Sequence, residues 1–262
     1  MGWETAVLAV ATGLVIAVLT APVGVSGAVF LLPVQLSVFD VPNPAVTPTN
    51  LLFNVVATPG ALLRYARRGT LASPLTKLLL VGTLPGVVVG AVIRVYAVPG
   101  PQVFRLLVAS VLLPLGGWLL ARTVRPSSSV GRSSPGMSPR ATTLSAAVVG
   151  VLGGIYGIGG GSILGPILVG RGLPVAVVAP AALSSTFVTS VVGSLTYAVL
   201  ALVEGGTVAP DWPLGIACGL GGLAGGYLGA WAQPYLPDMW LRLLLAIVAI
   251  GVALTYVGQV LL

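Results

Sequence analysis

The amino-acid sequence predicts an all-α integral membrane protein made of two inverted repeats. Each repeat has about five helical elements, some of them short helices or re-entrant hairpins broken by glycine and proline. The 262 residues are 56% hydrophobic and only 6% charged, whereas an ordinary soluble domain carries about 25% charged residues. Two glycine-rich breaks interrupt apolar stretches, and the second half of the chain repeats the pattern of the first.

Apolar stretches bounded by glycine, proline or charged residues predict the helical elements in order. A helix needs about 20 apolar residues to span a bilayer. The first two elements of each half are shorter than this and are joined by a break, so each pair is either two tilted crossings or one re-entrant hairpin. The predicted elements are 5–20, 25–39, 48–66, 72–96 and 103–122, then 143–157, 161–170, 178–203, 213–232 and 239–261.

The stronger break lies at 153–166, with the sequence GGIYGIGGGSILGP. Each glycine inside a helix costs roughly 1 kcal/mol relative to alanine, and a membrane segment tolerates irregular backbone only where it is buried in protein or lines a cavity. We therefore expect one helix to end here and another to begin near Ser162. The free N–H groups and positive dipole end of the new helix are suited to an anion. A fainter copy of this break runs from Ala21 to Gly27.

The two halves match each other in the same order at offsets of roughly 130–140 residues. The stretch 24–33 matches 157–166, and the Gly-x-x-x-Gly-Ala pattern at 86–91 recurs at 225–230. An odd number of elements in each half inserts the two repeats upside down relative to one another, which places a binding site at their interface near the midplane. We therefore expect a first repeat at 1–122, a Ser/Pro/Arg linker at 123–140 and a second repeat at 141–262.

The basic residues predict the orientation. Positive residues favour the cytoplasmic side, so the linker is expected in the cytoplasm and both termini outside. Arg94 and Arg105 are the exceptions, expected at the outer side of the membrane, and attraction of anions from outside by Arg94 stays an open alternative. The basic residues that set this orientation are Arg64, Arg67, Arg68, Lys77, Arg122, Arg125, Arg132, Arg140 and Arg171.

The composition also excludes several kinds of chemistry. The chain has no histidine and a single cysteine, Cys218, which removes the usual zinc sites and Ser-His or Cys-His nucleophilic pairs. No Asp or Glu falls in the middle of a predicted span, so a buried carboxylate relay for protons is not expected. We expect no enzyme activity, no cofactor and no metal.

Three stretches together resemble the TauE/SafE (sulfite exporter, or TSUP) family. They are GGIYGIGGGSILGPIL, the Pro-Ala-x-x-Ser-Ser-Thr-Phe run at 180–187 and Tyr-Ala-Arg-Arg-Gly at 65–69. The resemblance covers nearly the whole chain apart from the linker. It implies a secondary transporter in the bacterial cell (inner or plasma) membrane that moves sulfite, a sulfonate such as sulfoacetate, or a similar small organic anion by alternating access. Its partners would be that anion and the lipid bilayer, not nucleic acid, with the chain a monomer or homodimer.

Two other functions stay open at this stage. One is a channel-like facilitator of a small neutral solute or weak acid, which would show no saturation at moderate substrate. The other is a membrane scaffold that transports nothing, against which stabilisation by a ligand would argue.

The candidate substrate-binding residues fall at the two breaks and on the helices that follow them. The glycines are expected to form a backbone N–H cradle, for which the alternative is close helix packing. The polar side chains are expected to donate to the anion, for which the alternative is bonding between helices or back to the preceding turn. Thr47 is expected to cap the helix that Pro48 begins. The candidates are Gly24, Ser26, Gly27, Asn50, Asn54, Gly157, Gly159, Gly160, Gly161, Ser162, Ser184, Ser185 and Thr186.

Overall fold

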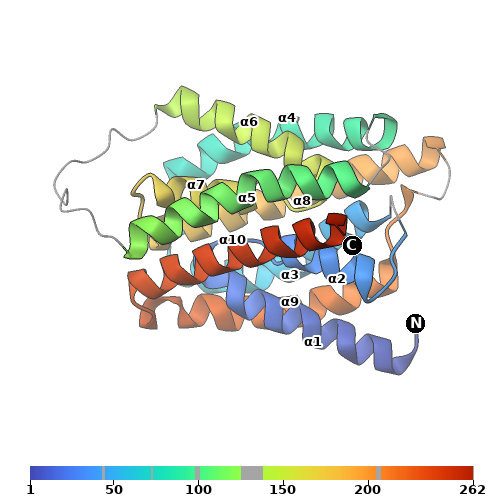
Figure 1. Ribbon diagram of the computed structural model, residues 1–262, viewed down its shortest axis with the longest axis horizontal. Helices are drawn as coiled ribbons and strands as arrows, with labels where there is room; N and C mark the ends of the chain where they lie inside the picture. The colour runs from blue at the N-terminus through green and yellow to red at the C-terminus, as the bar shows by residue number, and fades with distance from the viewer. Residues whose placement is uncertain (43–44, 72, 98–100, 125–137, 205–207, 262) are drawn as a thin grey trace.

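The computed structural model describes all residues except 43–44, 72, 98–100, 125–137, 205–207 and 262. Long helices run along one common direction, and both chain termini lie at the same end of the bundle (Figure 1). The end of α5 and the start of α6, between which most of the predicted linker falls, lie at the opposite end. The residues 125–137 of that linker lie outside the described residues, whereas 123–124 and 139–140 are helical.

Each predicted helical element is confirmed, and the described residues contain no strand. The boundaries agree to within about four residues because apolar runs end where glycine, proline or charge begins. The helices are α1 (Trp3–Thr20), α2 (Ala28–Ser37), α3 (Val46–Ala66), α4 (Pro74–Tyr96), α5 (Pro101–Val124), α6 (Pro139–Tyr156), α7 (Gly161–Gly170), α8 (Val175–Glu204), α9 (Trp212–Ala232) and α10 (Asp238–Leu261), with short 3-10 turns η1 (Ala21–Val23) and η3 (Gln233–Tyr235).

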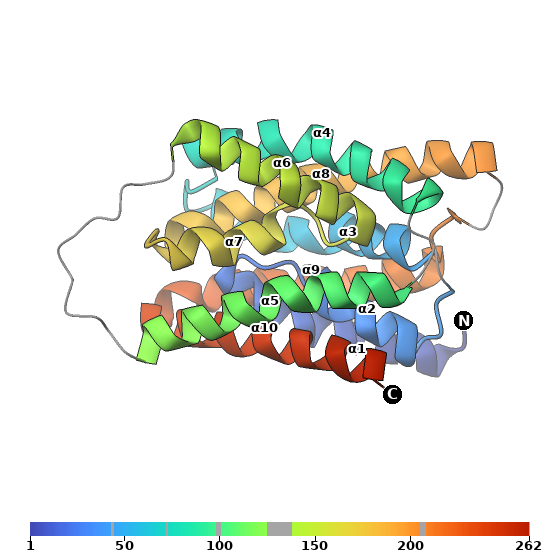
Figure 2. The same cartoon turned by 45° about the horizontal axis from the view of Figure 1, so that its top comes forward.

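Each short helix folds back on the helix before it. Gly24 and Gly157, at φ 76° and 69°, end the first helix of each pair in the left-handed conformation that glycine adopts without strain. The chain then reverses, so α2 returns toward the end at which α1 began, and α7 returns toward the opposite end, where α6 began (Figures 1 and 2). The pairs α1–α2 and α6–α7 are therefore hairpins that enter the bundle from opposite ends.

Helices from the two halves of the chain pair through glycine. A Cβ on Gly86 of α4 would lie 2.4 Å from the carbonyl oxygen of Ala147 in α6, and one on Gly225 of α9 would lie 2.2 Å from that of Leu14 in α1. Such distances leave room for hydrogen only, so the repeated Gly-x-x-x-Gly patterns bring backbone against backbone. The first half thus packs its α4 on α6 of the second half, and the second half packs its α9 on α1 of the first.

The outer surface is apolar, as a bilayer requires. Four helical segments among the described residues are long and apolar enough to cross a membrane: Trp3–Val23, Pro74–Tyr96, Val175–Val203 and Trp212–Tyr235. Large hydrophobic side chains face outward, for example Leu202 at 87% exposure. Polar side chains such as Asn54 and Ser185 lie inside instead, so the polar centre of the bundle is shielded from lipid.

Candidate functional site

The two breaks meet in the interior of the bundle. The backbone N–H of Ser26, just before α2, donates to Ser162 Oγ in the first turn of α7 at 3.2 Å. Ser162 Oγ in turn donates to the carbonyl oxygen of Ile158 at 2.7 Å. Because α2 and α7 come from opposite ends, this contact joins the N-terminal ends of both short helices at one place.

Asn54 of α3 links both breaks through its side-chain amide. Its Oδ1 accepts a hydrogen bond from Ser26 Oγ, and its Nδ2 donates to the carbonyl oxygen of Gly157 at 3.4 Å. Ser26 Oγ also accepts from the backbone N–H of Ala28 at 3.1 Å, in the first turn of α2. Ser26 and Asn54 are 2% and 1% exposed, so this network holds the first break against the second without help from bulk water.

Asn50 lies one helical turn before Asn54 and approaches the same two breaks. Its Nδ2 donates to the carbonyl oxygen of Ala28 at 2.9 Å. Its Oδ1 is buried and makes no hydrogen bond within the described part of the chain. A Cβ on Gly157 would lie 3.0 Å from Asn50 Cβ and 2.3 Å from the carbonyl oxygen of Thr47, so glycine is required there by both conformation and space.

The glycines that open α7 form a turn and also pack closely against neighbouring residues. Gly159 has φ 69°, which is a turn, and a Cβ on it would lie 2.5 Å from Thr186 Cγ2. The N–H of Gly160 donates to Thr189 Oγ1 at 3.2 Å, and a Cβ on Gly161 would lie 1.8 Å from the Ala182 carbonyl oxygen. Turn and close packing therefore coexist in this segment.

Some donors at this centre have no acceptor among the described residues. The backbone N–H groups of Gly27 and Gly159 donate no hydrogen bond in that part of the chain. The buried hydroxyls of Thr186 and Ser190 likewise make none within it. Buried polar groups are normally hydrogen-bonded, so these four donors mark the place where a bound polar group would be satisfied.

The two remaining predicted hydroxyls, those of Ser184 and Ser185, have different partners. Ser185 is buried and lies 3.1 Å, Oγ to Oγ1, from Thr83 of α4. Ser184 is half-buried and donates to the carbonyl oxygen of Pro180 in its own helix at 2.8 Å. The structure thus brings the predicted residues together except for Ser184, which bonds back to the preceding turn.

A small cavity adjoins the first break between α1, α3 and α9. Ser26, Gly27 and Asn54 line it together with Phe53 and Thr58, and it offers about 20 Å³ to a water-sized sphere. A cavity holding one water needs about 10–15 Å³ by this measure. An anion the size of sulfite would need the surrounding helices to separate.

Matching tyrosines donate hydrogen bonds to a backbone carbonyl group at each break. Tyr65 of α3 donates through its hydroxyl to the Ala21 carbonyl at 3.1 Å, and Tyr197 of α8 donates to the Gly154 carbonyl at 2.8 Å. The last carbonyls of a helix have no partner within it, and a membrane interior supplies no water. The same residue type at corresponding positions therefore closes both breaks.

One predicted contact beside the second break is wrong. Thr47 does not cap α3, which begins at Val46 after Ala45; instead its Oγ1 donates to the Ile155 carbonyl at 3.2 Å. Arg94 lies next to it, enclosed in the bundle at 3% exposure, and its Nε donates to Thr47 Oγ1 at 3.3 Å. The close α4–α6 pairing draws the end of α4 against the break, and so encloses the Arg94 side chain.

Sequence reasoning also missed Thr83, whose methyl group fills the space beside Gly160 and whose hydroxyl contacts Ser185. A threonine inside the apolar 74–96 stretch, two residues before Pro85, was the available signal.

Among the described residues, no group of three or more His, Cys, Asp or Glu is placed to hold a metal ion.

Comparison with known proteins gives one family. The family model described as sulfite exporter TauE/SafE matches residues 9–256. A search of curated proteins and a search of solved structures returned no match.

Proposed function

This chain belongs to the TauE/SafE sulfite exporter family, and on that basis we propose that it exports a small oxyanion such as sulfite or a sulfonate, bound where α2 and α7 meet. The family consists of membrane transporters of anions rather than enzymes, and the apolar helices fit a multi-pass membrane protein. The position of the binding site and the identity of the anion are our proposal.

One observation carries the proposal: the N-terminal ends of two buried helices converge from opposite ends on Ser26 and Ser162. Each helix N-terminus is equivalent to roughly half a positive charge, and the two fields add at this point. Two free donors are the backbone N–H groups of Gly27 and Gly159, beside Ser26 and Ser162 in the chain. Thr186, whose hydroxyl is also free, lies against Gly159, and Ser190 follows one turn later on α8. Fixed positive potential together with unused donors favours an anion over a neutral solute.

We propose further that 1–122 and 141–262 are inverted repeats. The two hairpins enter from opposite ends, and Tyr65 and Tyr197 bond to carbonyl groups at corresponding positions. Gly24 approaches Ala179, and Gly157 approaches Thr47; these two neighbours each precede the proline of a matching helix. Both repeats therefore contribute one short helix to the same central site, as transporters with inverted repeats do.

Transport then requires the centre to open to each side in turn. The cavity at Ser26 is too small for a substrate, so this conformation is closed around the site, and rocking of one repeat against the other would open it. With the linker in the cytoplasm of a bacterial cell and both termini outside, an inside-negative membrane favours anion export by about 2.3 kcal/mol per charge per 100 mV.

The direct experiment measures thermal unfolding of the purified protein in detergent against sulfite, thiosulfate, sulfoacetate, taurine, acetate and sulfate. Stabilisation grows as RT ln(1 + [L]/Kd), so a millimolar ligand registers when it is added well above Kd. We expect a saturable shift with sulfite or a sulfonate. The matched variants are Gly160→Ala, whose Cβ would lie 2.4 Å from Thr83 Cγ2, and Gly251→Ala, whose Cβ meets nothing within 4 Å.

The shift should be lost in G160A and kept in G251A. A panel without any shift, or one that acetate alone produces, would contradict the substrate class. Flux into liposomes that rises linearly with concentration, without saturation, would favour the channel-like alternative.

A further inference from the structure

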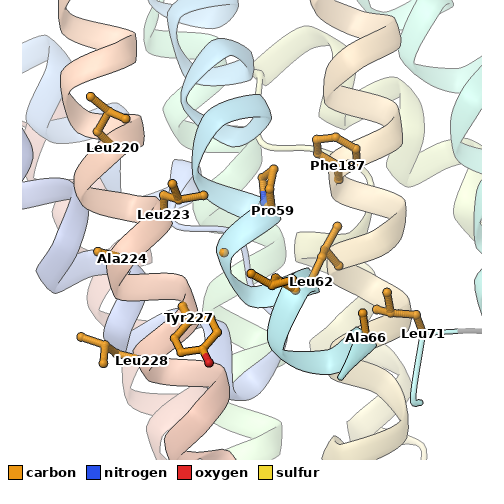
Figure 3. A pocket seen from close by; sticks show the side chains of 12 residues that line it. Pro59, Leu62, Ala66, Leu71, Phe187, Leu220, Leu223, Ala224, Tyr227 and Leu228 are labelled. Carbon is orange, nitrogen blue, oxygen red and sulfur yellow. The ribbon is translucent and has the colours of Figure 1, made fainter. Parts of the chain in front are cut away.

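An apolar groove of about 810 Å³ runs along the outside of the bundle between α3, α8 and α9. Figure 3 shows Pro59 and Leu62 between Phe187 on one side and Leu223 and Tyr227 on the other. From Leu220 to Leu228 the groove follows α9 over eight helical steps, which is about 12 Å at 1.5 Å per step. These dimensions suit an extended hydrocarbon chain.

The contact between α3 and α9 forms one side of this groove. A Cβ on Gly60 would lie 1.9 Å from the Leu223 carbonyl oxygen, so the two helices touch backbone to backbone there. Their opposite faces serve different surfaces: Ala57 and Gly226 line the small central cavity, whereas Leu63 and Leu228 line the groove and are 50% and 49% exposed. The groove is thus a feature of the lipid-facing surface and is separate from the anion site.

Two arginines stand at one end of this groove. Arg67 Nη1 donates to the hydroxyl of Tyr227 at 3.0 Å, and its guanidinium carbon lies 5.8 Å from the centre of that ring. Arg68 Nη2 donates to the carbonyl oxygen of Trp231 at 3.1 Å. The described residues place no carboxylate in an ion pair with these two guanidinium groups.

Exposed aromatic rings mark the same end as the membrane interface. Trp231 and Tyr235 are 46% and 69% exposed, and their ring centres lie 5.2 Å apart. Tryptophan and tyrosine gather at headgroup level in membrane proteins. The arginines therefore lie at the depth of lipid phosphates, and the apolar groove extends from there toward the bilayer centre.

We propose that this groove is a binding site for an anionic phospholipid, with an acyl chain along α3 and α9 and the phosphate on Arg67 and Arg68. Basic residues between membrane helices at the interface bind acidic headgroups in this way. A second copy of the chain is a poorer occupant. A symmetric dimer buries the same patch from both subunits, which would set arginines against arginines and desolvate their charges.

The test uses native mass spectrometry of the full chain released from mixed micelles with phosphatidylglycerol or phosphatidylcholine. We expect one phosphatidylglycerol to be retained in preference to phosphatidylcholine. Arg67→Gln should reduce that preference about fivefold, the effect expected for one basic residue at an acidic membrane surface. Arg171→Gln, which removes a basic residue from the loop after α7, is the matched control and should leave the preference unchanged.

A second variant tests the chain rather than the headgroup. Ala224→Phe fills the groove while leaving both arginines in place, so it should lower retention of long-chain phosphatidylglycerol but not of the dihexanoyl form. Equal retention of the two lipids by the parent protein would overturn the proposal. Equal losses in R67Q and R171Q would show diffuse attraction only, and a lipid-free dimer whose interface is broken by A224F would assign the groove to a second copy.

Discussion

Replacing Ser26 with alanine tests whether the two breaks are held together as the structure indicates. The Ser26 hydroxyl donates to Asn54 Oδ1 and accepts from the Ala28 N–H. Its loss therefore leaves one buried acceptor and one buried donor. The matched variant is Ser184→Ala, which removes the same hydroxyl from a side chain that bonds only to its own helix.

The size of the effect follows from these contacts. Two hydrogen bonds at the membrane-protein average of about 0.6 kcal/mol give a lower value of roughly 1 kcal/mol. Two buried groups left without partners at about 1–3 kcal/mol each give an upper value of roughly 6 kcal/mol. Because the adjoining cavity of about 20 Å³ admits a single water, that water can satisfy one group. We expect S26A to lose about 2–3 kcal/mol, whereas S184A should stay within about 0.5 kcal/mol.

The assay is thermal unfolding in detergent combined with anion flux in proteoliposomes. A loss of about 2–3 kcal/mol corresponds to a melting temperature lower by roughly 5–10 °C for a chain of this size. Flux should fall in S26A at temperatures where the protein is still folded, because the first break is no longer held against the second. Equal behaviour of S26A and S184A in both measurements would refute the bridging role of Ser26.

Two pairs of substitutions and one labelling experiment test other parts of the fold. Gly157→Ala should destabilise more than Gly172→Ala, since both glycines have positive φ but only a Cβ at 157 meets a carbonyl oxygen at 2.3 Å; equal melting temperatures would contradict this. Gly86→Ala should lower stability because its Cβ would lie 2.4 Å from the Ala147 oxygen, whereas Gly117→Ala, with open space around it, should gain up to about 1 kcal/mol of helix propensity; chemical denaturation of both variants compares them. Cys218 is fully buried, so N-ethylmaleimide should modify it only in unfolded protein, and rapid labelling of the native form by mass spectrometry would disprove that burial.

The helices of this protein are predictable from its sequence because each is a local pattern. The element at 161–170 was predicted with its observed bounds, since Gly160 and Arg171 bracket an apolar run. The left-handed turns at Gly24 and Gly157 follow from glycine placed between two such runs. Hydrogen bonds between residues far apart in the sequence cannot be predicted in this way. Asn54 donates to Gly157 only because the fold brings two distant segments together in one register.

The misplaced helix cap shows the limit of such patterns. Thr47 has the residue type and position of a helix cap, yet a tertiary partner, the Ile155 carbonyl, takes its hydroxyl. Arginine is costly within a membrane, yet the α4–α6 contact encloses Arg94 in the bundle. In each case packing between the two halves overrides a local preference. No local sequence pattern shows which residues of the two halves will be in contact.

The asymmetry between the two halves at the centre leads to a final prediction. The first half supplies Asn54, whose amide is already used to join the breaks, whereas the second half supplies Thr186, whose buried hydroxyl has no partner among the described residues. Thr186→Val removes that hydroxyl with little change of shape. If the hydroxyl serves only the fold, its removal should lower stability; if it serves a bound anion, stability should hold or rise, because an unsatisfied buried group is removed. We expect unchanged or higher melting temperature together with weaker anion-dependent stabilisation and slower flux, the opposite of the joint loss expected for S26A. Unchanged flux in T186V would remove this hydroxyl from the anion's path and leave the backbone N–H groups of Gly27 and Gly159 as the remaining unused donors.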